Sequence, residues 1–402
     1  MLYRSLVDYV LAFNTSTNFC DIKIDGRLRR NLLEQARTPD LLQIPINVPI
    51  LGKEEINAVT TVLKKGPLTS SASGGGKNVQ EFEKSAASFV KSKFAVAVNS
   101  GTSALQAALY ALDIKKGDEV LLPSFTFVAT ANSVVSVGAK PVFVDILKEN
   151  YTIDPDDLRK KITKKSKVII PVHLYGNVAF IDQIIEIANK YNLKIIEDAA
   201  QSLGSTLKNK QTGTFSDLGC YSLYPAKVVT SGEGGFIVTD NEKLHKKLKM
   251  IRNHGMVHGY DTRIIGMNLR MPEINAAIAK VQMKKLGKFL GIRKKNAKIL
   301  SELISDLYIQ IPQERKGEHV NWYLYTIATK NRNKIMKTLN SAGIGATAYY
   351  STPVHKTPFY HKKISLPNTD WATSSVLSLP IHPQVSEQNL SFISKILHKV
   401  LN

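Results

Sequence analysis

Short apolar segments alternate with segments of helical amphipathic pattern from about residue 94 to residue 250. Phe180–Tyr191 is one of the helix-like segments, and apolar segments occur at residues 118–122, 141–146 and 168–173. Near-continuous apolar strands separated by helices are typical of a mainly parallel sheet that is covered on both faces. The pattern therefore predicts an α/β fold. Ligands of such sheets bind beyond the carboxyl ends of the strands, where Ser100, Ser124 and Asp198 are expected.

One lysine lies between a polar turn and a glycine-rich turn. Lys227 follows Ser222-Leu-Tyr-Pro-Ala and precedes Gly232-Glu-Gly-Gly, which leads into the apolar segment Phe236–Asp240. A lysine restrained in this way presents its amine at the edge of a sheet, as Schiff-base chemistry with the aldehyde of pyridoxal requires. A solvated loop lysine is the alternative interpretation of this segment alone.

Two carboxylates end a second apolar segment, Leu193–Asp198. A pyridoxal enzyme needs one carboxylate that keeps the ring nitrogen of the cofactor protonated. Acidic residues at the end of a strand can also simply cap the next helix. We expect that capping role for Glu197 and the cofactor role for Asp198.

A third segment predicts an anion site. The chain passes from the apolar run Phe94–Val98 through Ser100, Gly101 and Thr102 into a helix-like segment. Free amides at a helix start, a glycine and neighbouring hydroxyls form a site for phosphate, although serine and threonine cap many helices. Ser222, five residues before Lys227, can donate a further hydroxyl to the same phosphate.

Together these segments resemble the DegT/DnrJ/EryC1/StrS family of pyridoxal-phosphate aminotransferases. The resemblance covers roughly residues 46–385 and rests on motifs in family order: Asn99-Ser-Gly-Thr-Ser-Ala-Leu, Pro123–Asn132, Pro171-Val-His-Leu-Tyr-Gly, Glu197-Asp-Ala-Ala-Gln, Pro225-Ala-Lys, Gly232-Glu-Gly-Gly and Gly266-Met-Asn-Leu-Arg-Met. It implies the fold of type I pyridoxal enzymes. After Met271 the sequence pattern changes and predicts helices at 273–281 and 286–307. A large domain is therefore expected at 46–285 and a smaller α/β domain at 286–402, with an N-terminal extension at 1–45 outside the resemblance.

The resemblance also implies a role for each matching residue. Lys227 would bond the cofactor and Asp198 would pair with its ring nitrogen, while the remaining contacts would come from Gln201 (the 3-hydroxyl), Phe127 (the ring face) and Ser222, Gly101 and Thr102 (the phosphate). Asn268 would reach the phosphate of the neighbouring subunit, which implies a homodimer with shared active sites.

Two histidines are candidate substrate contacts. His173, at a strand end, is expected either to border the cofactor ring or to be a hydrogen-bonded core residue. His355 resembles a family histidine near the phosphates of the substrate. No histidine shows metal-ligand spacing, so no metal is expected. The segment Ser71–Asn78 is longer than the glycine turn of many family members, so substrate contacts in that region cannot be transferred from them.

The net charge of +21 comes from lysine and arginine spread along the chain. This distribution fits solvated helix faces, and no nucleic-acid-binding motif accompanies it. Residues 6–13 are too short an apolar run to span a bilayer, so a cytoplasmic protein is expected. The two cysteines, Cys20 and Cys220, are not expected to pair.

The expected reaction is transfer of an amino group from L-glutamate to a keto sugar, most often a nucleotide-linked one in this family. Some family members are dehydratases with histidine in place of the lysine, so Lys227 favours transamination. A simple keto sugar phosphate is an alternative acceptor, and a cofactor-binding regulator without turnover is an alternative class. The identity of the sugar, the carbon aminated and the stereochemistry do not follow from the sequence.

Overall fold

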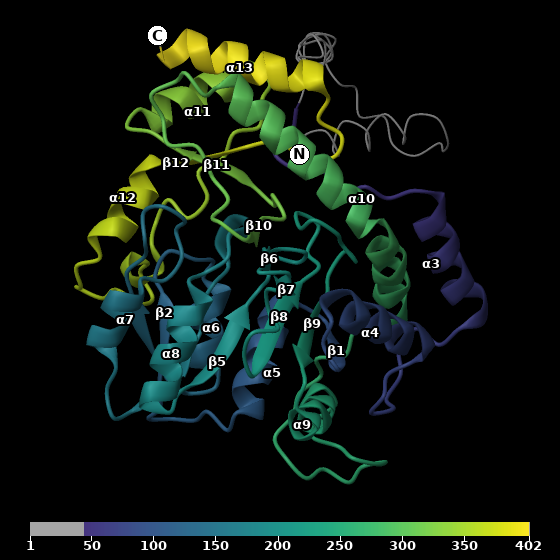
Figure 1. The fold of residues 1–402 in the computed structure, drawn as a ribbon. Helices are drawn as coiled ribbons and strands as arrows, with labels where there is room; N and C mark the ends of the chain where they lie inside the picture. Colours follow the sequence, from purple (N-terminus) through teal and green to yellow (C-terminus); the bar gives the residue numbers. More distant parts are fainter. Residues whose placement is uncertain (1–43, 402) are drawn as a thin grey trace, which may run out of the picture. The chain divides into compact units, whose positions relative to one another are not determined.

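A computed structural model of the protein describes residues 44–401 (Figure 1). Its centre is a seven-stranded sheet of order β1-β9-β8-β5-β4-β2-β3. Strands β3, β2, β4, β5 and β8 pair in parallel, and β9 runs antiparallel to both β8 and β1. The predicted mainly parallel sheet is confirmed. The strands are β1 Phe94–Val98, β2 Glu119–Pro123, β3 Lys140–Val144, β4 Ser166–Ile169, β5 Lys194–Asp198, β8 Leu218–Ser222 and β9 Gly235–Thr239.

Helices cover both faces of this sheet. Neighbouring residues of β9 show the two faces, because Phe236 packs in one apolar cluster with Phe82 of α4, and Ile237 packs in another with Leu248 of α9. This alternation follows from the two-residue repeat of a strand. The helices of this part are α3 Lys53–Lys65, α4 Lys77–Val90, α5 Gly101–Ala111, α6 Ala129–Ser136, α7 Pro155–Lys161, α8 Ile181–Tyr191 and α9 Glu242–Arg252, with a 3₁₀ turn η1 at Leu174–Gly176.

The C-terminal part adds two small sheets and more helices. Strand β10 joins the hairpin β6–β7, and β11 pairs with β12. Apolar side chains of β11, β12, α11 and α13 form a separate core cluster. The elements are β6 Thr206–Leu207, β7 Lys210–Gln211, β10 Glu318–His319, β11 Tyr325–Ala328, β12 Val376–Leu379, α10 Glu273–Leu303, α11 Arg332–Ser341, η2 Val354–Lys356, α12 Pro367–Ser375 and α13 Glu387–Leu401.

Helix α10 is one continuous helix of 31 residues. The sequence pattern predicted two helices, at 273–281 and 286–307, and this prediction is wrong. Residues 282–285 are Gln-Met-Lys-Lys, all of which favour helix, and α10 packs on α3, α4 and α13 along its length. The domain boundary at residue 285 falls inside α10, and the division into a large and a small domain remains a prediction.

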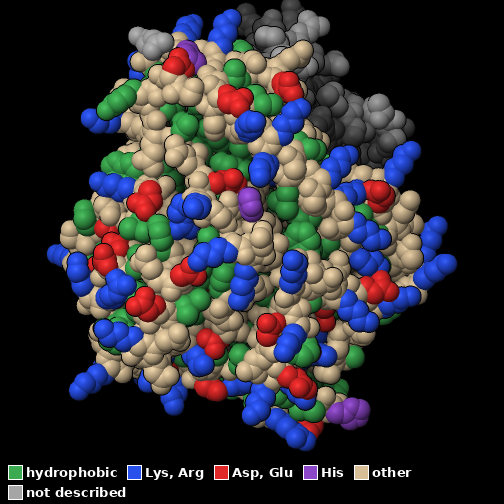
Figure 2. All heavy atoms as spheres, viewed as in Figure 1, with side chains coloured by type: hydrophobic (Ala, Val, Ile, Leu, Met, Phe, Trp, Pro, Cys, Tyr) green, Lys and Arg blue, Asp and Glu red, His purple; other side chains and the backbone are tan. Residues whose placement is uncertain are grey.

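The expected N-terminal extension lies almost wholly outside the described residues, which begin at Ile44. Within residues 44–401, no helix combines the length and the apolar character that crossing a bilayer requires. Figure 2 shows lysine and arginine side chains scattered over the visible face among acidic ones, as the charge distribution along the sequence predicted.

Candidate active site

Asp198 is the last residue of β5, at the carboxyl edge of the parallel strands. Only 5% of it is exposed. Its Oδ2 accepts a hydrogen bond from the hydroxyl of Thr130 (2.8 Å), and its Oδ1 accepts one from the amide of Ala200 (3.2 Å). Burial raises the pKa of Asp198, and these two donors and the nearby Lys227 ammonium partly oppose that rise. A carboxylate in this position is suited to pair with a cation.

Lys227 lies in a tight loop between β8 and β9. The amide of Leu223 donates to the carbonyl of Gly234 at 2.9 Å, and the amide of Ser231 donates to the carbonyl of Leu223 at 3.0 Å. These two hydrogen bonds close the loop. Burial lowers the pKa of Lys227 to about 8, and Asp198 opposes that shift. About half of the amine is therefore uncharged at pH 8, which makes a nucleophilic amine available near working pH.

Polar groups meet at the start of α5. Ser100 caps this helix, since its Oγ accepts from the amide of Ser103 at 3.0 Å. The first helix amides have no partner within a helix. A Cβ atom on Gly101 would lie 2.8 Å from the Cβ of Ser222, so these two residues are adjacent although they come from different strand ends. The arrangement is a cradle suited to a phosphate group.

An aromatic group borders the same edge of the sheet. Phe127 is 57% exposed, and its ring lies 6.5 Å from that of Tyr350. Tyr350 accepts a hydrogen bond from the side-chain amide of Gln201 at 2.9 Å. The other end of Gln201 accepts from the amide of Tyr175 at 2.9 Å. The exposed ring of Phe127 is thus available to stack on a planar ligand.

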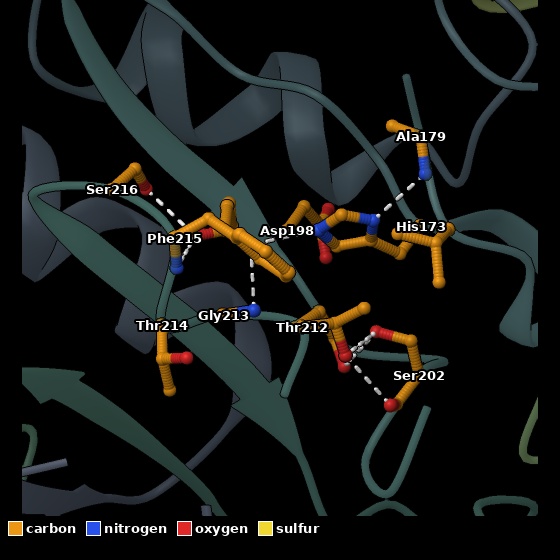
Figure 3. Close-up of polar contacts among 12 residues, drawn as sticks. His173, Ala179, Asp198, Ser202, Thr212, Gly213, Thr214, Phe215 and Ser216 are labelled. Carbon is orange, nitrogen blue, oxygen red and sulfur yellow. Dashed lines mark hydrogen bonds and ion pairs between the residues drawn. The ribbon is translucent and has the colours of Figure 1, made fainter. Parts of the chain in front are cut away.

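Glu197 is fully buried in a network of polar groups. Figure 3 shows its partners His173, Gly213, Phe215 and Ser216. Its carboxylate accepts hydrogen bonds from the Nε2 of His173 (3.0 Å), the amides of Gly213 (2.6 Å) and Phe215 (2.8 Å), and the hydroxyl of Ser216 (2.8 Å). The prediction that Glu197 caps a helix is wrong. Adjacent residues of a strand face opposite sides of the sheet, so Glu197 points away from Asp198 and anchors the 213–216 loop instead.

Three further predicted site residues are His173, His355 and Asn268. The backbone amide of His173 donates to the carbonyl of Asp198 at 3.0 Å. His173 donates to Glu197 through Nε2, while its Nδ1 accepts from the amide of Ala179 at 3.1 Å, which fixes the tautomer. His355 is buried and its Nδ1 contacts the hydroxyl of Ser124 at 2.6 Å. Burial lowers the pKa of His355. The rings of both histidines contact protein groups, and their contacts with substrate remain predictions. Asn268 is exposed.

The long segment Ser71–Asn78 is held by side chains of the α9 end. Arg252 Nη2 donates to the carbonyl of Ser73 at 2.7 Å, and Asn253 Nδ2 donates to that of Ser71 at 2.8 Å. Within residues 44–401, no cluster of histidine, cysteine and acidic side chains suited to a metal ion occurs.

Sequence reasoning missed Thr130, Tyr350 and Tyr175 as neighbours of the site. Thr130 follows Phe127 by three residues, and its amide donates to the carbonyl of Phe127 at 3.1 Å in the turn that leads into α6. Tyr175 and Tyr350 are far apart in sequence and come together only in the fold, with ring centroids 6.3 Å apart.

The residues at this edge of the sheet fit pyridoxal phosphate. A phosphate cradle, a partly neutral lysine and a buried carboxylate lie together at the carboxyl ends of parallel strands, the arrangement of fold type I pyridoxal-phosphate enzymes. The protein is an enzyme of this class.

The model of the DegT/DnrJ/EryC1/StrS aminotransferase family matches residues 49–398. The chain belongs to this family, whose members use pyridoxal phosphate. It is similar to the UDP-2-acetamido-2-deoxy-3-oxo-D-glucuronate aminotransferase of Pseudomonas aeruginosa, with 36% identity over 80% of this chain and 90% of that protein.

Two other relatives bear on function. A protein of Geobacillus stearothermophilus named "pleiotropic regulatory protein" is 35% identical over 79% of this chain and 88% of its own length. The crystal structure of S. venezuelae DesV superposes with a TM-score of 0.83 at 32% identity, covering 88% of this chain and 98% of that one.

Proposed function

We propose that this aminotransferase moves an amino group from L-glutamate to a keto sugar, most often nucleotide-linked, in amino-sugar biosynthesis. The observation that carries the proposal is the placement of Lys227 and Asp198 beside the cradle at the start of α5. The relative that acts on a UDP-linked oxo sugar supports the acceptor class.

Each residue of the site would make a different contact with pyridoxal phosphate. Lys227 would hold the cofactor through its Nζ, Asp198 would favour a protonated ring nitrogen, and Gln201 and Phe127 would contact the 3-hydroxyl and the ring face. Gly101, Thr102 and Ser222 would bind the phosphate. When bound, pyridoxal phosphate supplies an electron sink that stabilises negative charge on the substrate carbon.

Lys227 would have a second task as the proton carrier. A general acid and base works best when its pKa lies near the working pH, and burial brings the pKa of Lys227 to about 8. Its Nζ can therefore accept a proton from the substrate carbon and return one within a turnover.

A first experiment tests the cofactor role. Purified protein with pyridoxal phosphate should show the visible absorbance of lysine-bound cofactor, and L-glutamate should discharge it. Lys227→Ala should abolish both signals, whereas Lys208→Ala, at an exposed lysine in a turn after β6, should leave them intact. Glutamate-dependent discharge that persists in Lys227→Ala would refute this mechanism.

A second experiment tests the acceptor. The amino form of the cofactor is offered nucleotide-linked keto sugars, keto sugar phosphates and neutral keto sugars. Discharge chiefly by the nucleotide-linked compounds is expected. Preference for simple phosphates would support the alternative acceptor, and equal discharge by neutral sugars would exclude recognition of an anion. No reaction with any amino donor would favour a regulator, a class that the name of the Geobacillus relative keeps open.

The shared-site homodimer is also a proposal. Asn268 is exposed, and the segment before it presents Tyr260 and Ile265 as exposed apolar side chains, which suits a contact with a second copy. If each site combines Lys227 of one copy with Asn268 of the other, mixing inactive Lys227→Ala and Asn268→Ala proteins should restore about a quarter of the activity, since half of the dimers are mixed and one site in each is intact. No recovery after subunit exchange would contradict the shared site.

The cytoplasmic location and the absence of a nucleic-acid partner stay predictions.

A further inference from the structure

The Nζ of Lys227 lies 4.8 Å from the centre of the Tyr323 ring. That distance is within the range in which the face of an aromatic ring attracts an ammonium group. Tyr323 precedes β11 in the C-terminal part of the chain and is only 6% exposed. No acceptor oxygen bonds the Nζ among residues 44–401, so the ring is its direct partner in the structure.

The backbone around Tyr323 is held from two sides. Its amide donates to the Oδ1 of Asn321 at 2.9 Å, and its carbonyl accepts from Arg293 of α10 at 3.2 Å. The side-chain amide of Asn321 donates in turn to the carbonyls of Gln201 (2.9 Å) and Leu203 (3.1 Å), next to the β5 end. The ring position is therefore fixed relative to Asp198 and the cofactor-facing residues.

The chain accepts an unusual conformation to present this ring. Trp322 has a φ of +53°, a left-handed conformation that bulky residues rarely adopt. Strained backbone of this kind is found preferentially where the surrounding contacts impose it, as at active sites. Here the two contacts that impose it are those of Asn321 and Arg293.

The other charged or ionisable groups around the lysine are few. Asp198 faces it from β5 and favours its charged form. Arg293 of α10 lines the same small cavity as Lys227, and the phenol of Tyr224 lies near that of Tyr323. Burial raises the pKa of Tyr323 to about 12, so its phenol stays neutral at working pH and the ring face carries the interaction.

We propose that Tyr323 is a positioning residue for Lys227. Its ring face holds the ammonium group whenever the Nζ is not bonded to the cofactor, and so keeps the protonated amine beside the reacting carbon. The inference rests on the proposed role of Lys227 as cofactor-binding lysine and proton carrier. It assigns a function to a residue that lies 96 positions further along the chain, outside the motifs on which the family resemblance rests.

Substitutions of Tyr323 distinguish the effect of its aromatic ring on the pKa of Lys227 from the effect of its hydroxyl. Tyr323→Phe keeps the aromatic face, and the pKa of Lys227 should stay within about 0.3 pH units of the wild-type value. Tyr323→Leu and Tyr323→Met remove the face, so the charged amine loses its partner and the pKa should fall by about 0.5 to 1 pH unit. Tyr308→Leu, at a fully exposed tyrosine, is the matched control and should leave the pKa of Lys227 unchanged.

The test uses the full-length, cofactor-free protein. Trace acylation by acetic anhydride at a series of pH values, read at the Lys227 peptide by mass spectrometry, gives the pKa of this one amine. Circular dichroism checks the folding of each variant, and the methionine variant replaces the leucine variant if the latter does not fold. A pKa unchanged in both non-aromatic variants, or a fall in Tyr323→Phe equal to theirs, would overturn the proposal.

A separate measurement keeps this proposal distinct from the cofactor role. If wild-type protein forms no lysine-bound cofactor absorbance, the proposed function fails whatever the pKa shows. If that absorbance forms and depends on Lys227, while ring removal leaves the pKa unchanged, only the role of Tyr323 fails.

Discussion

Replacing Glu197 by glutamine tests the buried network beside the active site. The carboxylate accepts four hydrogen bonds, two at each oxygen, from His173 and Gly213 and from Phe215 and Ser216. A glutamine of the same shape must place an NH₂ group at one of these positions. Facing Ser216, the NH₂ can still donate to the hydroxyl, but the amide of Phe215 then meets a donor.

The expected cost follows from that conflict. If the NH₂ group instead replaced the oxygen that faces His173 and Gly213, both of their hydrogen bonds would be lost. His173 cannot change tautomer to accept from the NH₂ group, because its Nδ1 already accepts from the amide of Ala179. Even the better orientation loses a hydrogen bond to a charged group and leaves a buried N–H without an acceptor. Each of these effects costs about 1–3 kcal/mol, so the free energy of unfolding should fall by about 3 kcal/mol.

Urea unfolding of the cofactor-free protein, followed by circular dichroism, measures this change. Glu186→Gln, at an exposed position of α8, is the matched control and should stay within about 0.5 kcal/mol of wild type. A loss below about 1 kcal/mol for Glu197→Gln would show that the four contacts do not hold the loop and would refute the reasoning.

Three further predictions concern the site itself. Gly101→Ala brings a Cβ to 2.8 Å from Ser222, so the dissociation constant of pyridoxal phosphate should rise at least about tenfold. Gly287→Ala, where the added atom meets nothing within 4 Å, should leave it unchanged, and equal effects would contradict the cradle. Asp198→Asn removes an interaction of about 4 kcal/mol for charges about 4 Å apart, so the glutamate half-reaction should slow by roughly a thousandfold in stopped-flow absorbance; a change below about tenfold would exclude an ion pair. Because the pKa of Lys227 is lowered to about 8, its uncharged form grows as pH rises through 8. Cofactor capture should therefore accelerate up to that pH and then level off, and a rate that keeps rising to pH 10 would indicate an unshifted lysine.

Local patterns predicted the sheet and the ends of its strands. The two-residue repeat and the apolar runs are properties of neighbouring residues, and they placed Ser100, Ser124 and Asp198 at the carboxyl edge of the sheet. The prediction of two helices in place of α10 is wrong, since no residue between 282 and 285 disfavours helix.

Other parts of the site could not follow from local sequence. The ring of Tyr323 reaches Lys227, 96 positions away, only because Asn321 and Arg293 hold its backbone. Glu197 and Asp198 are adjacent and chemically alike, and only their opposite directions from the strand separate their surroundings.

The continuity of α10 constrains how the active site can open and close. At 1.5 Å per residue, a helix of 31 residues is roughly 45 Å long. It packs on α3 and α4 near one end and on α13 near the other, so the two ends cannot swivel independently about a joint at residue 285. Movement of one end of α10 relative to the other would require the helix to bend. Gly287 and Gly291 have open space where a side chain would be, so they are the positions at which side chains restrict bending least.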